Sequence, residues 1–178
     1  MKKTLFLMLA LWLASSPIML AQTTSGTKPA QRATASRTVH TRPYIDIEAA
    51  DTAGVVHRLS EYVGHDGYVL LDFWASWCRP CMAVLPSVKA AYEQYHEKGL
   101  QIVSVSLDTQ RTAWISTIRK HGMEWPNISD LKGWESAPAA AYGVRAIPAM
   151  LLIDSKGQVV ASGSFGVVKQ KLVEIYGD

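Results

Sequence analysis

Apolar residues follow two different spacings along the chain, and each change of spacing predicts where a strand gives way to a helix. The run 68–74 is almost wholly apolar, which is typical of a strand that is buried on both faces. From residue 79 the apolar positions recur at spacings of three and four, and this period predicts a helix over 79–96. Residues 101–107 alternate with a period of two, which indicates a second strand.

The rest of the chain continues this alternation of strands and helices. Two short strands at 43–47 and 55–59, joined by a turn at 52–54, predict an N-terminal β-hairpin. The remaining expected elements are a helix at 111–120, a short strand at 127–129, a helix at 135–142, strands at 149–153 and 158–162 around a turn at 154–157, and a last helix at 167–176. Strands that alternate with helices and end in a hairpin and a helix predict an α/β fold with a mixed sheet.

The first 42 residues carry a different pattern. Residues 1–21 have two lysines directly after Met1, then a short apolar stretch, and small residues near the end, which is the build of a secretory signal peptide cleaved after Ala21. An uncleaved membrane anchor is the alternative, although Ser-Ser-Pro interrupts the apolar run before it reaches the ~20 residues of a full span. Residues 22–42 are rich in Thr, Ser and Ala, so we expect a disordered basic linker before a single domain at 43–178.

Charge is unevenly distributed along the chain. The formal net charge is +3, but the first 42 residues hold six basic residues and no acid, which leaves 12 basic against 15 acidic residues in 43–178. The expected domain is therefore mildly acidic and offers no basic face for nucleic acid.

The only two cysteines, Cys78 and Cys81, lie at the junction between the expected strand 68–74 and the expected helix 79–96. A structural disulfide framework would have more cysteines, spread apart. A zinc site would need two further ligands at suitable spacing, and the five histidines are scattered, so we expect neither a metal nor a bound cofactor. Unpaired N–H groups and the helix dipole favour a thiolate at a helix N-terminus, so this spacing suits reversible dithiol–disulfide exchange.

A wider pattern surrounds the two cysteines. Residues 72–81 read Asp-Phe-Trp-Ala-Ser-Trp-Cys-Arg-Pro-Cys and, with Pro86, closely resemble the active-site strand and helix of the thioredoxin superfamily. Residues 142–148 resemble that superfamily's approach to its cis-proline, and 106–108, 130–134 and 152–157 resemble its exported TlpA/ResA-like branch. The resemblance covers roughly 43–176. It implies a thioredoxin fold, with helices flanking a mixed central sheet and the N-terminal hairpin as an extension.

Different roles are expected for the two cysteines. Cys78 is the predicted nucleophile, because it stands at the helix start, where it should be more exposed and closer to the dipole, and because Arg79 adds a positive charge beside it. Cys81 lies one turn further in and is the predicted resolving thiol, buried and with a higher pKa. A static disulfide, or two inert buried thiols, is the alternative.

Asp72 is the predicted base for the resolving step. Burial in an apolar strand raises the pKa of a carboxyl group towards the range useful for proton transfer. The alternative is an aspartate kept for structure and paired to backbone or water. The resemblance is incomplete here, because Ser104 stands where thioredoxin has a lysine and Val84 where many branch members have a glutamate. Asp72 is then the only acid expected near the sulfurs.

The resemblance also predicts where a substrate binds. The Ile147–Pro148 bond is expected to be cis, in a loop that faces the cysteines and pairs with the substrate backbone as a short strand. Trp77, with Arg79 and Pro80, is expected to form a docking surface beside Cys78, although a packed surface aromatic is the alternative for Trp77. The other tryptophans considered, Trp114, Trp125 and Trp134, are expected to pack in the core or in an insert.

Together these patterns predict an exported, periplasmic thiol–disulfide oxidoreductase, with a membrane-anchored form as the alternative. We expect a monomer that exchanges disulfides with protein partners, in the reductive direction, and receives electrons from a donor protein. One alternative is a peroxiredoxin-like peroxidase, whose cysteine lies in a Thr/Ser-x-x-Cys turn without a Cys-x-x-Cys. The other is a non-enzymatic metallochaperone of thioredoxin fold, which needs a wider cysteine spacing and a partnered histidine.

Overall fold

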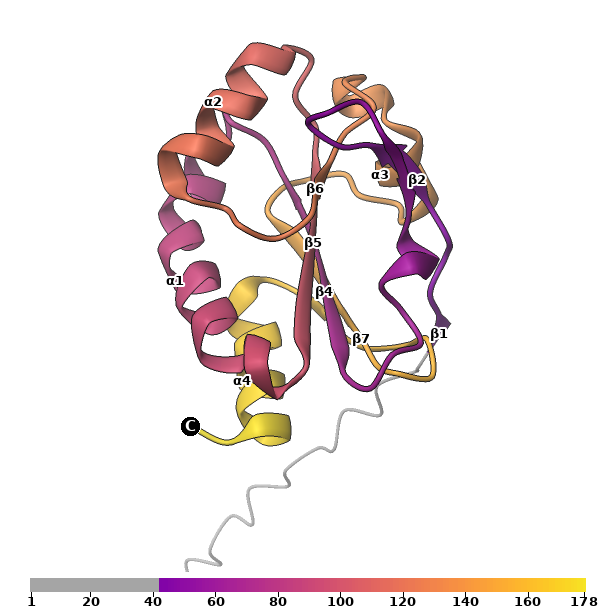
Figure 1. The fold of residues 1–178 in the computed structure, drawn as a ribbon, viewed down its shortest axis with the longest axis vertical. Helices are drawn as coiled ribbons and strands as arrows, with labels where there is room; N and C mark the ends of the chain where they lie inside the picture. The colour runs from indigo at the N-terminus through magenta and orange to yellow at the C-terminus, as the bar shows by residue number, and fades with distance from the viewer. Residues whose placement is uncertain (1–41) are drawn as a thin grey trace, which may run out of the picture. The chain divides into compact units, whose positions relative to one another are not determined.

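The computed structural model describes residues 42–178, so the predicted signal peptide and all of the predicted linker except Arg42 lie outside the described residues. The central sheet has six strands in the order β1-β8-β7-β4-β5-β6 (Figure 1). In chain order these strands are β1 (Arg42–Pro43), β4 (Tyr68–Trp74), β5 (Leu100–Ser106), β6 (Asn127–Ile128), β7 (Ala149–Ile153) and β8 (Gln158–Gly163). The β4–β5 and β5–β6 pairs are parallel and the others antiparallel, so the sheet is mixed as predicted.

Helices cover both faces of this sheet. They are α1 (Arg79–Tyr95), α2 (Arg111–His121), α3 (Ala137–Ala141) and α4 (Phe165–Tyr176). Figure 1 shows α1, α2 and α4 on one face, and α3 with the N-terminal hairpin on the other. Crossovers between parallel strands are right-handed, so α1 and α2, which follow successive strands in one direction across the sheet, lie on the same face. Within residues 42–178, no helix combines the length and the apolar character needed to cross a membrane.

The strand that precedes the cysteines lies at the centre of the sheet. β4 pairs with β5 on one side and with β7 on the other, and every residue from Val69 to Trp74 is buried. Because both faces of the sheet are covered, the side chains of β4 are buried whichever way they point, which explains the continuous apolar run in the sequence. This coverage also fixes the surroundings of Asp72, the one acid in that strand, which is buried with its neighbours.

The predicted strand at 43–47 is wrong in extent. Only Arg42 and Pro43 pair with β8, and Arg42 therefore belongs to the sheet and not to the linker. The backbone that follows is held by other groups: the Tyr142 hydroxyl donates to Ile45 O (2.8 Å) and accepts from Ile45 N (3.0 Å). Because a side chain takes these hydrogen bonds, no neighbouring strand pairs there. The hairpin forms later, from β2 (Glu48–Ala50) and β3 (Val56–Arg58).

The predicted helix at 135–142 is also divided. A 3₁₀ turn at Gly133–Glu135 precedes α3, and Ser136 separates the two as the N-cap of α3. The Ser136 hydroxyl accepts from Ala139 N, and Pro138 stands in the first turn, where its missing N–H costs nothing. The strands β4 and β7 have the predicted bounds. The helices α1 and α2 differ from prediction by one residue at their C-terminal ends, and β5 begins and ends one residue earlier than predicted.

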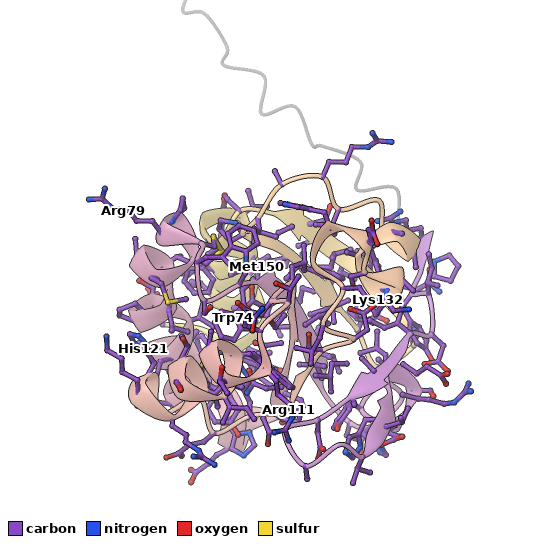
Figure 2. All side chains as sticks on the ribbon, turned by 90° about the horizontal axis from the view of Figure 1, so that it is seen from above. Trp74, Arg79, Arg111, His121, Lys132 and Met150 are labelled. Atoms are coloured by element: carbon purple, nitrogen blue, oxygen red, sulfur yellow. A yellow bond between two sulfur atoms is a disulfide. The ribbon has the colours of Figure 1, made fainter. Side chains whose placement is uncertain are left out.

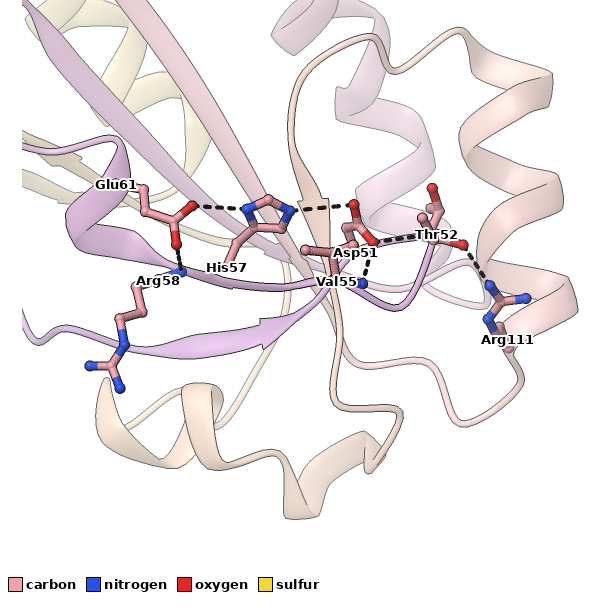
Figure 3. Close-up of polar contacts among 8 residues, drawn as sticks. Asp51, Thr52, Val55, His57, Arg58, Glu61 and Arg111 are labelled. Carbon is pink, nitrogen blue, oxygen red and sulfur yellow. Dashed lines mark hydrogen bonds and ion pairs between the residues drawn. The ribbon is translucent and has the colours of Figure 1, made fainter.

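The N-terminal hairpin is held by a polar cluster around His57, which Figure 3 shows. The imidazole lies between two carboxylates, with Nδ1 2.9 Å from Glu61 Oε2 and Nε2 3.3 Å from Asp51 Oδ2. The hydrogen bond to Glu61, and then that to Asp51, raise the pKa of His57 above its ordinary value. Arg111, at the start of α2, donates to Thr52 O and so ties the tip of the hairpin to that helix (Figure 3).

Candidate active site

Cys78 is the N-cap residue of α1, and the structure holds it in a disulfide with Cys81. The first turn of a helix has amide groups without partners in the helix, and an N-cap side chain accepts from them. Here Cys81 N donates to Cys78 Sγ at 3.1 Å. Cys78 is thus the sulfur that receives both an amide proton and the positive end of the helix dipole, and both favour its thiolate once the disulfide is reduced.

The expected difference in exposure between the two cysteines is wrong for this oxidised form. Cys78 is 4% exposed and Cys81 is 3% exposed. Cys78 is covered because it is bonded to Cys81 and because the loop that contains Pro148 lies against it, with Ile147 O 3.8 Å from Cys78 Sγ. A disulfide sulfur has no proton to donate, so this distance records proximity and not a hydrogen bond.

A buried carboxylate anchors the turn that leads into Cys78. Asp108 follows β5 and accepts from Ser76 twice, from the backbone N at 3.0 Å and from the hydroxyl at 2.6 Å. The Ser106 hydroxyl donates to the same carboxylate at 2.7 Å. These bonds fix Ser76, two residues before Cys78, against the end of the neighbouring strand. The sequence pattern draws attention to 106–108 only as part of a resemblance and gives Asp108 no role.

Asp72 and Cys81 line the same small cavity, which has a volume of about 10 Å³. Burial raises the pKa of Asp72 from 3.8 to about 7, and a hydrogen bond from Ser104 opposes this rise. Asp72 Oδ2 accepts that bond at 3.2 Å, while Oδ1 has no hydrogen-bond partner among the described residues. The other lining residues are Trp74, Met82, Val84, Leu85, Val88 and Pro148, so Asp72 is the only acid that lines the cavity.

The two departures from the thioredoxin pattern both fall beside Asp72. Ser104 lies next to it in the parallel register of β4 and β5, where the resemblance to thioredoxin places it. Val84 lines the cavity from α1. A serine and a valine replace two ionisable side chains, so no charged neighbour contributes to the raised pKa of Asp72.

The loop before β7 brings Ile147 and Pro148 to the cysteines. The Ile147–Pro148 peptide bond is cis in the structure. Pro148 lines the cavity with Asp72 and Cys81, and Ile147 O faces Cys78 Sγ. Both residues are half-buried. β4, the start of α1 and this loop thus meet around Asp72 and Cys81, and β5 adds the hydrogen bond from Ser104 to Asp72.

Two exposed tryptophans lie side by side next to Cys78. Trp77 is 55% exposed and Trp134 is 53% exposed, and their ring centroids are 6.1 Å apart. Of the three tryptophans expected in the core or in an insert, Trp114 and Trp125 are buried, whereas Trp134 is exposed and lies against Trp77. Trp134 lies on the 3₁₀ turn between β6 and α3, whose position relative to Trp77 no local pattern reveals.

Arg79 and Pro80, the residues between the two cysteines, are both exposed. Figure 2 shows Arg79 extending outward from the start of α1, while Trp74 and Met150 lie in the interior. A charge that extends into water is strongly screened, so its effect on the Cys78 thiolate is modest. Elsewhere in residues 42–178, no three histidine, cysteine or acidic side chains come together in a way that could hold a metal ion.

Comparisons with known proteins agree with this geometry. A family model described as the AhpC/TSA family matches residues 41–162. The thiol-disulfide oxidoreductase ResA of Geobacillus thermodenitrificans is 31% identical over 114 residues, which are 64% of this chain and 63% of that protein. The ResA of Bacillus thuringiensis subsp. konkukian is 31% identical over 124 residues, which are 70% of this chain and 69% of that protein. The chain thus matches slightly less than two thirds of the Geobacillus relative's length.

Solved structures show the same fold. A thiol-disulfide oxidoreductase from Bacteroides fragilis superposes with a TM-score of 0.69 at 26% identity, over 75% of this chain and 99% of that one. A putative thiol:disulfide interchange protein DsbE from Chlorobium tepidum gives 0.66 at 28% identity, over 76% and 95%. The predicted thioredoxin-like fold is confirmed. Because the matched residues 41–162 make up more than half of the chain and include both cysteines and Pro148, the chain belongs to the AhpC/TSA family.

Proposed function

We propose that this protein is a thiol–disulfide oxidoreductase that exchanges disulfides with protein partners through Cys78 and Cys81. The observation that carries the proposal is the inequality of the two sulfurs. Cys78 Sγ accepts an amide proton at the N-terminus of α1, whereas Cys81 shares a small cavity with a carboxyl group whose pKa is near neutral. One sulfur is arranged to be a thiolate, and the other to lose its proton only during the reaction.

In the first step, the Cys78 thiolate of the reduced protein attacks one sulfur of a partner's disulfide. A bond forms between Cys78 and that sulfur, and the partner's other sulfur leaves as a thiolate. The amide of Cys81 and the helix dipole stabilise the attacking thiolate, and they do so at the position where the negative charge lies. Asp108 supports this step indirectly, because it holds the turn that sets the position of Cys78.

In the second step, Cys81 resolves the mixed disulfide. Its thiol gives a proton to Asp72, directly or through one water, and the Cys81 thiolate attacks Cys78 Sγ. The intramolecular disulfide forms, and the partner leaves as a thiolate that takes up a proton. The two cysteines have then given two electrons to the partner, and the protein is in the oxidised form that the structure shows. A donor protein with a dithiol returns it to the reduced form.

The exposed residues around Cys78 are proposed to dock the partner. The Ile147 carbonyl faces Cys78 and can pair with an extended substrate backbone, as a short added strand does. Trp77 and Trp134 offer a shared apolar surface beside it, and Arg79 and Pro80 complete the exposed rim. Exposed aromatic pairs of this kind carry much of the affinity of many protein interfaces.

Trp134→Ala tests the docking surface. We expect the KM for a protein disulfide to rise about five- to tenfold with little change in kcat, because one aromatic contact is worth about 1–1.5 kcal/mol. Reduction of a small aromatic disulfide, which cannot span both rings and the Ile147 loop, should stay within about twofold. Val56→Ala, which removes an exposed apolar residue from β3, is the matched control and should change neither substrate. Equal losses with both substrates would remove Trp134 from the docking surface.

The location and the direction of the reaction belong to the same proposal. The N-terminal sequence, with its charged start, apolar stretch and small residues, supports export to the periplasm, with retention at the membrane if it is not cleaved. The reductive direction follows from the resemblance to the TlpA/ResA-like branch. A reduction potential measured against glutathione decides the direction, since a more negative value than that of the partner's disulfide makes reduction of the partner favourable.

Three assays on one purified sample separate the proposed function from its alternatives. We expect the reduced protein to reduce insulin disulfides at a rate that depends on Cys78. We expect no consumption of hydrogen peroxide above the level of a free thiol, and no stoichiometric copper binding. Fast peroxide turnover without insulin reduction would favour the peroxidase, and tight copper binding without either activity would favour the metallochaperone.

A further inference from the structure

Three buried polar side chains form a continuous chain that ends at Asp72. Trp125, in the segment before β6, donates from Nε1 to Ser104 Oγ at 2.8 Å. Ser104, on β5, donates in turn to Asp72 Oδ2 at 3.2 Å. All three residues are at most 3% exposed, so water does not compete for these bonds. The ring of Tyr92, on α1, packs 5.2 Å from the ring of Trp125 and helps to fix the indole.

The direction of this chain follows from the chemistry of its members. An indole N–H can only donate, so the Ser104 oxygen must be the acceptor of the first bond. A serine hydroxyl carries one proton, and Asp72 Oδ2 is its acceptor here. Turning the second bond round would leave the hydroxyl proton buried without an acceptor, which is unfavourable. Trp125 therefore orients the Ser104 hydroxyl towards the carboxylate.

The same direction distinguishes the two oxygens of Asp72. Oδ2 already receives the Ser104 proton, whereas Oδ1 has no hydrogen-bond partner among the described residues. When Asp72 takes up a proton, Oδ1 is the oxygen that is free to hold it. Burial and the Ser104 bond act on the pKa of Asp72 in opposite senses, and burial is the larger effect. Without the Ser104 bond, the carboxyl group would hold its proton to higher pH.

We propose that Ser104 and Trp125 are positioning residues: they supply Asp72 Oδ2 with an oriented donor, keep the carboxylate available as a base, and reserve Oδ1 for the proton of Cys81. This inference rests on the proposed function, in which Asp72 is the base of the resolving step. Ser104 stands where thioredoxin has a lysine. In this proposal Ser104 acts on Asp72 as a neutral hydrogen-bond donor, where a lysine would act as a cation.

Among the described residues that pair with Asp72 or share its cavity, none brings a second charge to the oxidised protein. The neighbour of Asp72 on β7 is Met150, and its neighbour on β5 is Ser104. From α1 and the loop before β7, the residues that share its cavity are Cys81, Met82, Val84, Leu85, Val88 and Pro148. Cys81 is the only one of these that titrates, and in the oxidised protein it does not. The oxidised protein therefore reports the ionisation of Asp72 without interference from a thiol.

The test measures Asp72 directly, by carbon-13 NMR of the labelled carboxyl group in the oxidised protein, assigned by its loss in Asp72→Asn. Ser104→Ala is expected to raise the pKa of Asp72 by about 1 to 2 pH units, the usual worth of a hydrogen bond to a charged group. Trp125→Phe should raise it by less, since the hydroxyl remains but can rotate. Ser104→Thr, which keeps the hydroxyl, should restore the parent value. Ser129→Ala is the matched control, because Ser129 is another buried serine, whose hydroxyl donates to Ser106 O.

The double variant decides whether Trp125 acts through Ser104. If it does, Trp125→Phe adds no further shift once Ser104 is replaced by alanine, so the two effects are not additive. An unchanged pKa of Asp72 in folded Ser104→Ala, or additive shifts in the double variant, would overturn the inference. If Ser104→Ala does not fold, Trp125→Phe alone still tests the chain of hydrogen bonds, and an unchanged pKa of Asp72 in that folded variant would overturn the inference. A shifted pKa with an unchanged pH profile for the resolving step would instead remove Asp72 as the base and leave the control of its ionisation standing.

Discussion

Cys81→Ser is expected to accumulate partner proteins as mixed disulfides on Cys78. The Cys78 thiolate can still attack a partner, but no second thiol is left to attack Cys78 and release that partner. Cys78→Ser should capture at least about tenfold fewer partners. Its remaining thiol lacks the N-cap position, and each unit by which a thiol pKa exceeds the working pH costs about a factor of ten in thiolate. The captured adducts should dissolve on addition of dithiothreitol, and turnover with insulin should be lost in both variants.

Non-reducing pull-down from a periplasmic fraction tests this expectation and identifies the partners. The double variant Cys78→Ser/Cys81→Ser is the control for adducts that do not involve either sulfur. Alkylation rates against pH, measured on the two single variants, should show that Cys78 titrates below Cys81. Equal rates would remove the nucleophile assignment. If Cys78 is reactive but no dithiothreitol-sensitive adduct appears, the partner is a small molecule and not a protein.

The junction of β4 with α1 can be predicted from sequence because its determinants are local. A strand buried on both faces reads as an apolar run, and a helix face reads as a spacing of three and four. The N-cap position of Cys78 follows from where the two patterns meet. The same local logic predicts β7 with its observed bounds, since the side chains of Met150–Ile153 are buried on both faces of the sheet.

The parts of the site that the sequence does not predict depend on contacts between distant segments. Trp134 lies 57 positions after Trp77, and Asp108 lies 32 positions after Ser76, so no periodicity connects them. The proposed role of Trp125 in orienting Ser104 cannot be predicted from the sequence for a different reason. It is buried as a core tryptophan should be, and only the partner of its single N–H distinguishes it from Trp114, whose N–H has none among the described residues.

The similar burial of the two cysteines has a related cause. A helix N-terminus is usually exposed, which is why the sequence predicts Cys78 to be the more accessible sulfur. Here the loop with Pro148 lies against that end of α1 and covers it, and this loop comes from 69 positions further along the chain. Trp77 and Arg79 remain exposed beside the covered sulfur, which is why we place the proposed docking surface there.

Asp72→Asn is expected to slow release of the partner by about 100-fold near pH 7, at the lower end of what a general base contributes. The amide keeps the size of the side chain and can still accept from Ser104, so the fold should persist. It cannot accept a proton from Cys81. Asp66→Asn, the same change at an exposed residue before the opposite end of β4, is the matched control and should leave turnover unchanged. Unchanged turnover in Asp72→Asn near pH 7 would show that Asp72 is not the base.

The same variant should change how stability depends on pH. The pKa of Asp72 is about 7 in the folded protein against 3.8 as its ordinary value, so between these limits the folded state binds more protons than the unfolded state. Stability from this group is therefore fully present below pH 3.8 and is lost as the pH rises through about 7, by roughly 4 kcal/mol in all. The asparagine side chain of the variant does not titrate and lacks this loss. Its new amide N–H, buried without a partner, costs about 1–3 kcal/mol, but it does so equally at every pH.

The informative quantity is thus the slope of the free energy of unfolding against pH, and not the free energy of unfolding at any single pH. Free energies of unfolding of the oxidised parent and variant, measured in urea at intervals from pH 4 to pH 8, should diverge in favour of Asp72→Asn up to about pH 7 and run parallel above it. Buried carboxylates without a charged partner are costly in this way, and removing one often stabilises a protein. Parallel curves would mean that the carboxyl group of Asp72 titrates normally in the folded protein, and a base poised near neutral pH would then have to be sought elsewhere. Diverging curves together with slow partner release would show that the protein gives up stability at neutral pH to keep a proton acceptor beside Cys81.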